Sequence, residues 1–344
     1  MITEQVHRYL LSGALAASSL SFPATSMAAD ANGSLRQTVA GYRDSSGQER
    51  GKLGLDSILK IGASGLNVGV SRERIRDDEW QNNKYLKEVY GHGEREVDAV
   101  NLGLTRTFAK LTDARIAGAY SSDGVVETRS IGAGASHWFV HETLQTSLDV
   151  TRSLVERPEY EILDFDATVL TAPPRVDTTA VSAGFRHLST PTTMTLATVT
   201  VSSSSDRPLA RLYHLGVRQY VPALSGSLHA AAYRGLNRGG LSTRTLYGEV
   251  DSWTGDFAWV QEAGRNTQIR LGWRVYQERE VGRAYDDVTQ YGSDLVSLNL
   301  VHEIPAEKSP LAGRPVAVDA GVSRYLSNQE LRATAANFGI SGKF

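Results

Sequence analysis

Charged and large apolar side chains alternate in several segments of this chain. In the segment QIRLGWRVYQE, Arg270, Arg274 and Glu278 share one parity, while Leu271 and Trp273 share the other. Successive side chains of a β-strand point to opposite faces, so the charges of this segment gather on one side. Charges removed from bulk water must be paired or hydrated. Such a face could therefore hold ion pairs or attract a charged solute.

The same alternation selects charges in four other segments. We expect the following residues to share a polar inner face with Arg270, Arg274 and Glu278: Arg186, Arg218, Asp149 and Asp319. If this face lines a water-filled channel, the stripe formed by Arg270 and Arg274 favours anionic solutes. The alternative is that the charges pair with one another and fill the interior.

Residues that would mark a hydrolase do not converge in the sequence. His137 adjoins Ser136, but neighbouring residues of a strand point to opposite faces. Nucleophile-elbow and metal-helix motifs are absent. We therefore expect a protein that is not an enzyme and that binds no cofactor.

Three polar segments contain oxygen or nitrogen ligands without a recognisable metal-ligand spacing. These segments are YGHGERE with His92, EYEILDFDATVL with Glu159, Glu161, Asp164 and Asp166, and AYDDVTQYG with Asp286 and Asp287. The second could bind calcium or fold into a lumen as a constriction. The alternative, which we favour, is an outer loop made soluble by its charges or a strand extension above the membrane. The sequence thus predicts no metal site.

The dominant period from Ser34 onward is two, which predicts strands rather than amphipathic helices. About sixteen segments alternate in this way and are bounded by turn residues. Their expected spans are 34–44, 51–63, 66–77, 94–108, 113–122, 125–140, 143–157, 176–189, 193–204, 209–221, 227–237, 241–262, 267–280, 293–304, 315–327 and 331–344. The span 241–262 is too long for one regular strand, and we expect a bulge or a turn within it.

The connections between these segments alternate between long and tight. Long polar connections include DDEWQNNKYLKEVYGHG and VGRAYDDVTQYG, whereas ASG, HET and ALSG are tight. PAEKSPLAGRP is the exception among the tight ones. Outer-membrane barrels show this asymmetry, with short periplasmic turns and longer outer loops. A soluble propeller or sandwich would also alternate, but the blade repeat of a propeller is not visible.

The N-terminal segment has the layout of a secretory signal peptide. A short polar start precedes a small, apolar stretch from Tyr9 to Phe22, and small residues surround Ala28 and Ala29. We expect residues 1–29 to be removed during export and residues 30–344 to form one barrel.

Composition excludes several classes. The 344 residues carry a formal net charge of −2, so the electrostatic case for binding nucleic acid is poor. The absence of cysteine excludes disulfides and thiolate metal sites. No run of about 18 apolar residues follows the N-terminus, so no spanning helix is expected.

In the C-terminal segment NFGISGKF, the large apolar residues Phe338, Ile340 and Phe344 share one parity, as on one face of a strand. It resembles the assembly signal of Gram-negative outer-membrane β-barrel proteins, in which a polar residue, a glycine and a final aromatic recur. Asn337, Gly339 and Phe344 match that signal, while Gly342 stands where a bulky apolar residue is usual. The resemblance implies recognition by the barrel-assembly machinery.

A narrower resemblance covers most of residues 90–290. GAYSSDGVVETRSIGAGASHW, AAAYRGLNRGGLSTRTLYGEVDSW and RLGWRVYQE are similar to segments of a largely uncharacterised family of bacterial outer-membrane barrels. That family implies a fold and supplies no catalytic residues.

These observations together predict an all-β protein, a transmembrane antiparallel up-and-down β-barrel of about 16 strands in the cell outer membrane. We expect a pore or facilitator for small polar solutes, with anions favoured by the arginines. The alternative is a non-transport barrel that acts as a surface-exposed or assembly component. The expected partners are outer-membrane lipid, the barrel-assembly machinery and a small solute.

Overall fold

The computed structural model describes most of the chain between Gly33 and Lys343. The described ranges are 33–45, 47–77, 94–108, 111–139, 142–156, 160–163, 169–172, 175–205, 209–238, 249–281, 288–309, 314–328 and 331–343. The predicted signal peptide and Phe344 lie outside these ranges, as do His92, Glu159, Asp164, Asp166, Asp286 and Asp287.

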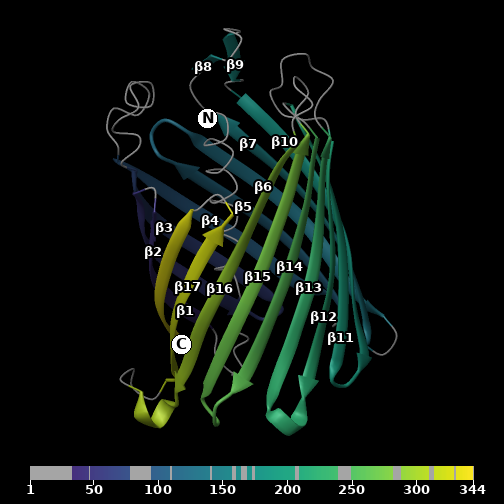
Figure 1. Ribbon diagram of the computed structural model, residues 1–344. Helices are drawn as coiled ribbons and strands as arrows, with labels where there is room; N and C mark the ends of the chain where they lie inside the picture. The colour runs from purple at the N-terminus through teal and green to yellow at the C-terminus, as the bar shows by residue number, and fades with distance from the viewer. Residues whose placement is uncertain are drawn as a thin grey trace. The chain divides into compact units, whose positions relative to one another are not determined.

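Sixteen antiparallel strands close into one barrel (Figure 1). Each strand pairs with its neighbours in sequence, and β1 closes the ring against β18. The strands of the barrel are β1 (Gly33–Asp44), β2 (Gln48–Ile61), β3 (Ser64–Asp77), β4 (Glu94–Phe108), β5 (Thr112–Ser122), β6 (Glu127–Phe139), β7 (Leu144–Glu156), β10 (Arg175–Thr190), β11 (Thr193–Ser204), β12 (Leu209–Val221), β13 (Gly226–Arg238), β14 (Glu249–Glu262), β15 (Thr267–Val281), β16 (Val288–Ile304), β17 (Val316–Ser327) and β18 (Arg332–Lys343). The predicted closed antiparallel barrel is confirmed.

Large apolar side chains are exposed on one face of the strands, which we call the outer face. Leu102, Leu148, Leu215 and Leu271 are each more than half exposed, at 55%, 54%, 62% and 52%. The alternate residues form the inner face. Within the described ranges only six apolar residues are buried. A soluble domain of this size would bury a continuous apolar core, so the polarity of this fold is inverted.

The connections follow the predicted asymmetry. At the end of the barrel that holds Gly33 and Lys343, six of the seven connections are tight, as between β2 and β3. The two short 3-10 helices, η1 (Pro222–Leu224) and η2 (Ala306–Lys308), belong to connections at this end. The two longest connections, between β3 and β4 and between β7 and β10, lie at the opposite end, which we call the long-loop end; four of its eight connections are short. No helix within the described residues is long and apolar enough to cross a membrane.

Three details differ from the sequence prediction, and one is that β16 begins at Val288, five residues before the expected start at 293. The expected strand 241–262 begins only at Glu249, and the residues from 239 to 248 lie outside the described ranges. The connection between β7 and β10 contains an unpredicted hairpin, β8 (Tyr160–Leu163) and β9 (Val169–Ala172), whose strands pair only with each other.

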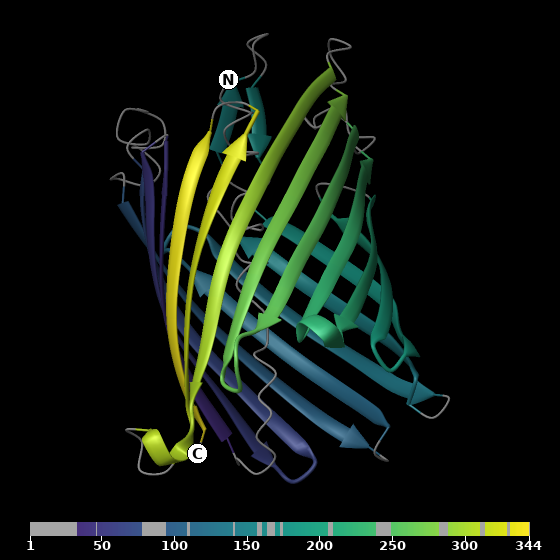
Figure 2. The same cartoon turned by 60° about the horizontal axis from the view of Figure 1, so that its bottom comes forward.

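The closing seam joins the two ends of the described chain. β1 and β18 pair along their full length, and Leu35 lies opposite Gly342. Figure 2 shows the yellow C-terminal strands beside the purple N-terminal strands. The expected closure of the last strand against the first near Leu35 is therefore seen, and Phe338 and Ile340 are exposed on the outer face, at 50% and 41%.

Candidate functional site: the charged inner wall

Inner-face glycines allow polar side chains to meet across an intervening strand. Asp149 of β7 pairs with Arg115 of β5, with 2.6 Å between a carboxylate oxygen and Nη2. Gly134 of β6 lies between them, and a Cβ there would stand 1.7 Å from the Asp149 carboxylate. The pair can therefore form only because position 134 has no side chain.

The same arrangement occurs at the seam. Arg36 of β1 donates to Asp319 of β17 at 3.0 Å, across β18. A Cβ on Gly339 would stand 2.4 Å from that carboxylate. Gly339, predicted as part of an assembly signal, thus also makes room for an inner-face ion pair. Asn337, the second signal residue described, lies two positions earlier on β18.

Three of the predicted arginines gather on the inner face of β12–β15. Arg218 lies directly opposite His229, and Arg274 lies directly opposite Asp256. Nη2 of Arg274 donates to the Asp256 carboxylate at 2.7 Å. Arg218 and Arg270 both act electrostatically on His229. We call these five residues the basic cluster.

The basic cluster carries an excess of positive charge. Three arginines face one carboxylate, which leaves a formal charge of +2 when the histidine is neutral. His229 Nε2 and Arg274 Nε are buried and have no hydrogen-bond partner. Arg218 is exposed and forms no ion pair with any other described residue. The exposed guanidinium group of Arg218 therefore keeps hydrogen-bonding capacity that an anion could use.

An aromatic pair lies beside the basic cluster. The rings of His214 on β12 and Tyr233 on β13 stack with centroids 4.2 Å apart and planes inclined by 4°. Both residues lie on the inner face, in register with each other. A stacked pair of aromatic rings with polar atoms therefore borders the cluster on the inner wall.

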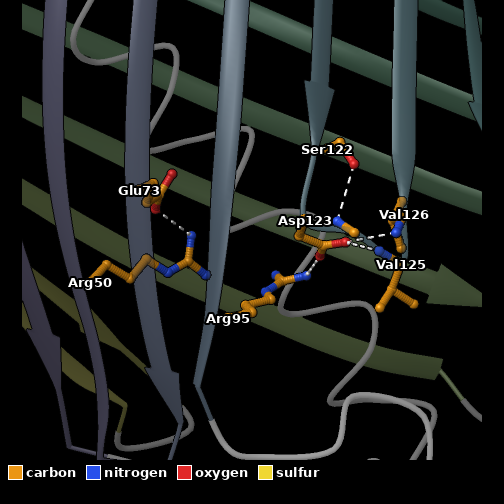
Figure 3. Close-up of polar contacts among 8 residues, drawn as sticks. Arg50, Glu73, Arg95, Ser122, Asp123, Val125 and Val126 are labelled. Carbon is orange, nitrogen blue, oxygen red and sulfur yellow. Dashed lines mark hydrogen bonds and ion pairs between the residues drawn. The ribbon is translucent and has the colours of Figure 1, made fainter.

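Charges near the long-loop end of β2–β5 are paired instead. Arg50 contacts Glu73 at 3.8 Å, and Arg95 contacts Asp123 at 2.9 Å (Figure 3). The Asp123 side chain is only 3% exposed and also accepts hydrogen bonds from the backbone N–H groups of Val125 and Val126 (Figure 3). This side of the inner wall thus carries little net charge.

The remaining predicted residues lie apart from the basic cluster. Arg186 on β10 is exposed, opposite Gln145 and Leu196, and forms no ion pair within the described ranges. Glu278 accepts a hydrogen bond from the hydroxyl of Tyr276 on the same strand. Of the seven predicted charges, the structure brings only Arg218, Arg270 and Arg274 together.

Sequence reasoning missed Asp256 and His229. Asp256 belongs to the over-long segment, yet it alternates with Phe257 and could have been found by parity. His229 alternates with Leu228 in the same way. Within the described residues no group of three or more histidine or acidic side chains could hold a metal ion.

Comparison with known proteins identifies a fold. No family model matches the chain, and no curated protein matches it. A solved bacterial polysaccharide outer membrane secretin superposes with a TM-score of 0.55 at 9% identity, over 92% of this chain and 100% of that chain. CdiB from Acinetobacter baumannii superposes with a TM-score of 0.54 at 10% identity, over 91% of this chain and 61% of that chain.

A third solved structure is the outer membrane protein OpdK from Pseudomonas aeruginosa, with a TM-score of 0.47 at 8% identity, over 91% of this chain and 98% of that chain. At such identities the likeness extends to the fold alone. On the two closer superpositions, the chain has the fold of bacterial outer-membrane β-barrel proteins.

Proposed function

We propose that this protein is an outer-membrane pore that passes small polar solutes and favours anions. The observation that carries the proposal is the basic cluster, in which Arg218 and Arg270 lie on the inner face of the barrel near the ion pair between Arg274 and Asp256.

The outer face supports a membrane location. Exposure of its leucines and valines to water would cost free energy, whereas these side chains suit the hydrocarbon interior of a membrane. The closed ring leaves no strand edge unpaired. Sixteen strands enclose a lumen wide enough for water. The small number of buried apolar residues argues against a packed interior.

The charge of the basic cluster supports the preference for anions. Positive charges on a low-dielectric wall raise the local concentration of counter-ions and speed their entry. A guanidinium group also binds carboxylate or phosphate through two parallel hydrogen bonds. On the inner wall of β2–β5, the carboxylates near Arg50 and Arg95 are neutralised by these arginines. They therefore add no competing attraction for cations.

Planar-bilayer recording tests both parts of the proposal. We expect single-channel steps from the purified protein and a reversal potential that reports anion preference in a salt gradient. The double variant Arg218→Gln, Arg270→Gln should move the reversal potential toward zero. The matched variant Arg211→Gln, Arg279→Gln removes arginines from the outer face of the same two strands and should leave it unchanged.

The outcomes separate the two parts. Absence of steps at every voltage that the bilayer tolerates would contradict the pore and favour a non-transport barrel. Steps with a reversal potential that the inner-face double variant does not move would contradict the role of the basic cluster alone.

A further inference from the structure

We propose that Arg43, Arg324 and Arg332 form a binding site for the phosphate group of an anionic lipid on the outer face of the barrel, across the closing seam. We call these three residues the seam arginines. The inference rests on the membrane location in the proposed function and is independent of conduction, because no seam arginine lies on the inner face.

The strand register brings the seam arginines together. Arg43 of β1 and Arg324 of β17 both lie directly opposite Thr334 of β18. Their Cα atoms are therefore about 10 Å apart, two strand spacings. Arg332 lies two residues before Thr334, on the same face of β18. Long guanidinium side chains can converge over Thr334 from these three positions.

The charge of this site differs from that of the other outer-face arginines. On β3 and β4, Arg72 donates to Asp98 at 2.7 Å, and Arg74 donates to Glu94. Each arginine of that ridge faces a carboxylate on the next strand. The ridge is neutral, and its guanidinium groups are engaged.

At the seam, the carboxylates are fewer and weakly engaged. Glu49 approaches Arg43 at 3.4 Å, but the two side chains are 47% and 77% exposed. Exposed pairs of this kind contribute about 0.2–1 kcal/mol. The nearby Asp294 of β16 accepts a hydrogen bond from the indole of Trp273 at 3.1 Å. Arg324 and Arg332 form no ion pair with any residue that the structure describes.

The surface next to the seam arginines is apolar and selects a lipid rather than a free anion. Toward the end that holds Gly33 and Lys343, the outer face presents Val39, Val322 and Phe338, at 49%, 47% and 50% exposed. Gly41 lies between this surface and Arg43, and a Cβ there would meet no atom within 4 Å. A phosphate on the arginines would leave an attached acyl chain over the apolar strip.

Native mass spectrometry of the full-length protein in detergent micelles tests the proposal. The probes are diphosphoryl lipid A, the same lipid without its phosphates, and inorganic phosphate. We expect the diphosphoryl lipid to bind, and the variant Arg43→Gln, Arg324→Gln, Arg332→Gln to weaken binding at least about tenfold. The matched variant Arg175→Gln, Arg211→Gln, Arg279→Gln removes as much charge from scattered outer-face positions and should bind within about twofold.

Several results of this experiment would overturn the proposal. Equal binding by the seam variant, equal loss in the scattered variant, or equal affinity for the dephosphorylated lipid would each refute a phosphate site at the seam. Inorganic phosphate that binds alone with the affinity of the lipid would refute a lipid site. If the seam triple variant is not recovered folded, Arg324→Gln replaces it and should give a smaller loss in the same direction. Bilayer conductance should be unchanged in every folded seam variant.

Discussion

Glycine residues on the inner face are as important for the charged wall as the charges themselves. The ion pair between Arg115 and Asp149 passes over Gly134, with no room for a Cβ. Gly41, on the outer face, would accept a Cβ freely. The two positions therefore separate the effect of steric displacement from the general effect of losing a glycine in a strand.

We predict that Gly134→Val lowers the free energy of unfolding by about 1–3 kcal/mol, because the new side chain must displace the Asp149 carboxylate. Gly41→Val should have little effect or a small stabilising one, since valine suits a strand. Thermal unfolding in detergent measures both. Equal melting temperatures for the two variants would show that the pair across β6 does not need the space at Gly134.

Removing the single carboxylate of the basic cluster should change anion selectivity in the opposite direction to the arginine variants. Asp256→Asn removes the partner of Arg274, whose side chain is only 16% exposed. We expect stronger anion selectivity, because the formal excess of the cluster rises from two charges to three. We also expect lower stability, by about 3 kcal/mol at most, since the guanidinium stays partly buried without its counter-ion.

Reversal potentials measured for both variants under the same salt gradient test the direction of this change in selectivity. Asp256→Asn should move the value away from zero, and Arg218→Gln, Arg270→Gln should move it toward zero. A shift in the same direction for both variants would mean that the cluster does not act through its charge.

Among the elements, the turn between β5 and β6 depends on one carboxylate for two of its hydrogen bonds and for its tie to the neighbouring strand. Asp123 accepts hydrogen bonds from the N–H groups of Val125 and Val126 and pairs with Arg95 of β4. Gly124 adopts a positive φ of 82°, which suits a tight turn. One nearly buried side chain therefore fixes the turn and ties it to the neighbouring strand.

We predict that Asp123→Ala destabilises this turn by about 3 kcal/mol, because it leaves Arg95 partly buried and two N–H groups unsatisfied. Hydrogen exchange should rise at Val125 and Val126 and remain slow in the middle of β5. Asp113→Ala is a suitable comparison, because Asp113 accepts one exposed hydrogen bond from Thr107. Unchanged exchange at the turn would contradict the role of Asp123.

Element boundaries show where sequence reasoning succeeds. Alternation located every strand of the barrel, because each strand has an apolar and a polar face. For the segment 241–262 it gave a span longer than β14, which begins at Glu249, and the residues before Glu249 lie outside the described ranges. It also missed β8 and β9, which are four residues each and too short to show a period.

The candidate site was only partly predictable for a different physical reason. Parity places Arg218, Arg270 and Arg274 on one face of their own strands. Which side chains meet depends on the register between strands and on inner-face glycines, and neither is visible in a single segment. Asp149 was therefore recognised as an inner-face charge, while its partner Arg115, two strands away, was not.

At the scale of the whole molecule, closure of the sheet into a ring determines which groups face the outside and which face the interior. A closed sheet has no edge strand, so β1 and β18 pair with each other across the seam and the outer face can present apolar side chains to lipid. Gly342, which departs from the usual assembly signal, lies opposite Leu35 in this seam. The 44% exposed leucine supplies apolar outer surface where Gly342 has none.

Closure also gives the sharpest test of the fold, because the chain has no cysteine of its own. Ala40 of β1 pairs directly with Asn337 of β18. Paired Cα atoms of antiparallel strands are about 4.5–5.5 Å apart, within the range that a disulfide spans. The variant Ala40→Cys, Asn337→Cys should therefore crosslink under mild oxidation and migrate faster than the reduced form on a denaturing gel.

The comparison variant Ala40→Cys, Ser323→Cys places the second thiol on β17, two strands from β1. Ser323 is also offset by two residues from the position opposite Ala40, so the two Cα atoms are more than about 10 Å apart, beyond the reach of a disulfide, and no crosslink should form. A crosslink in neither variant would indicate an open sheet, and a crosslink in both would indicate a mobile seam. The crosslink joins two strands that are already paired in the closed barrel, so it leaves the wall of the pore unchanged. The crosslinked protein should therefore keep the conductance of the unmodified protein.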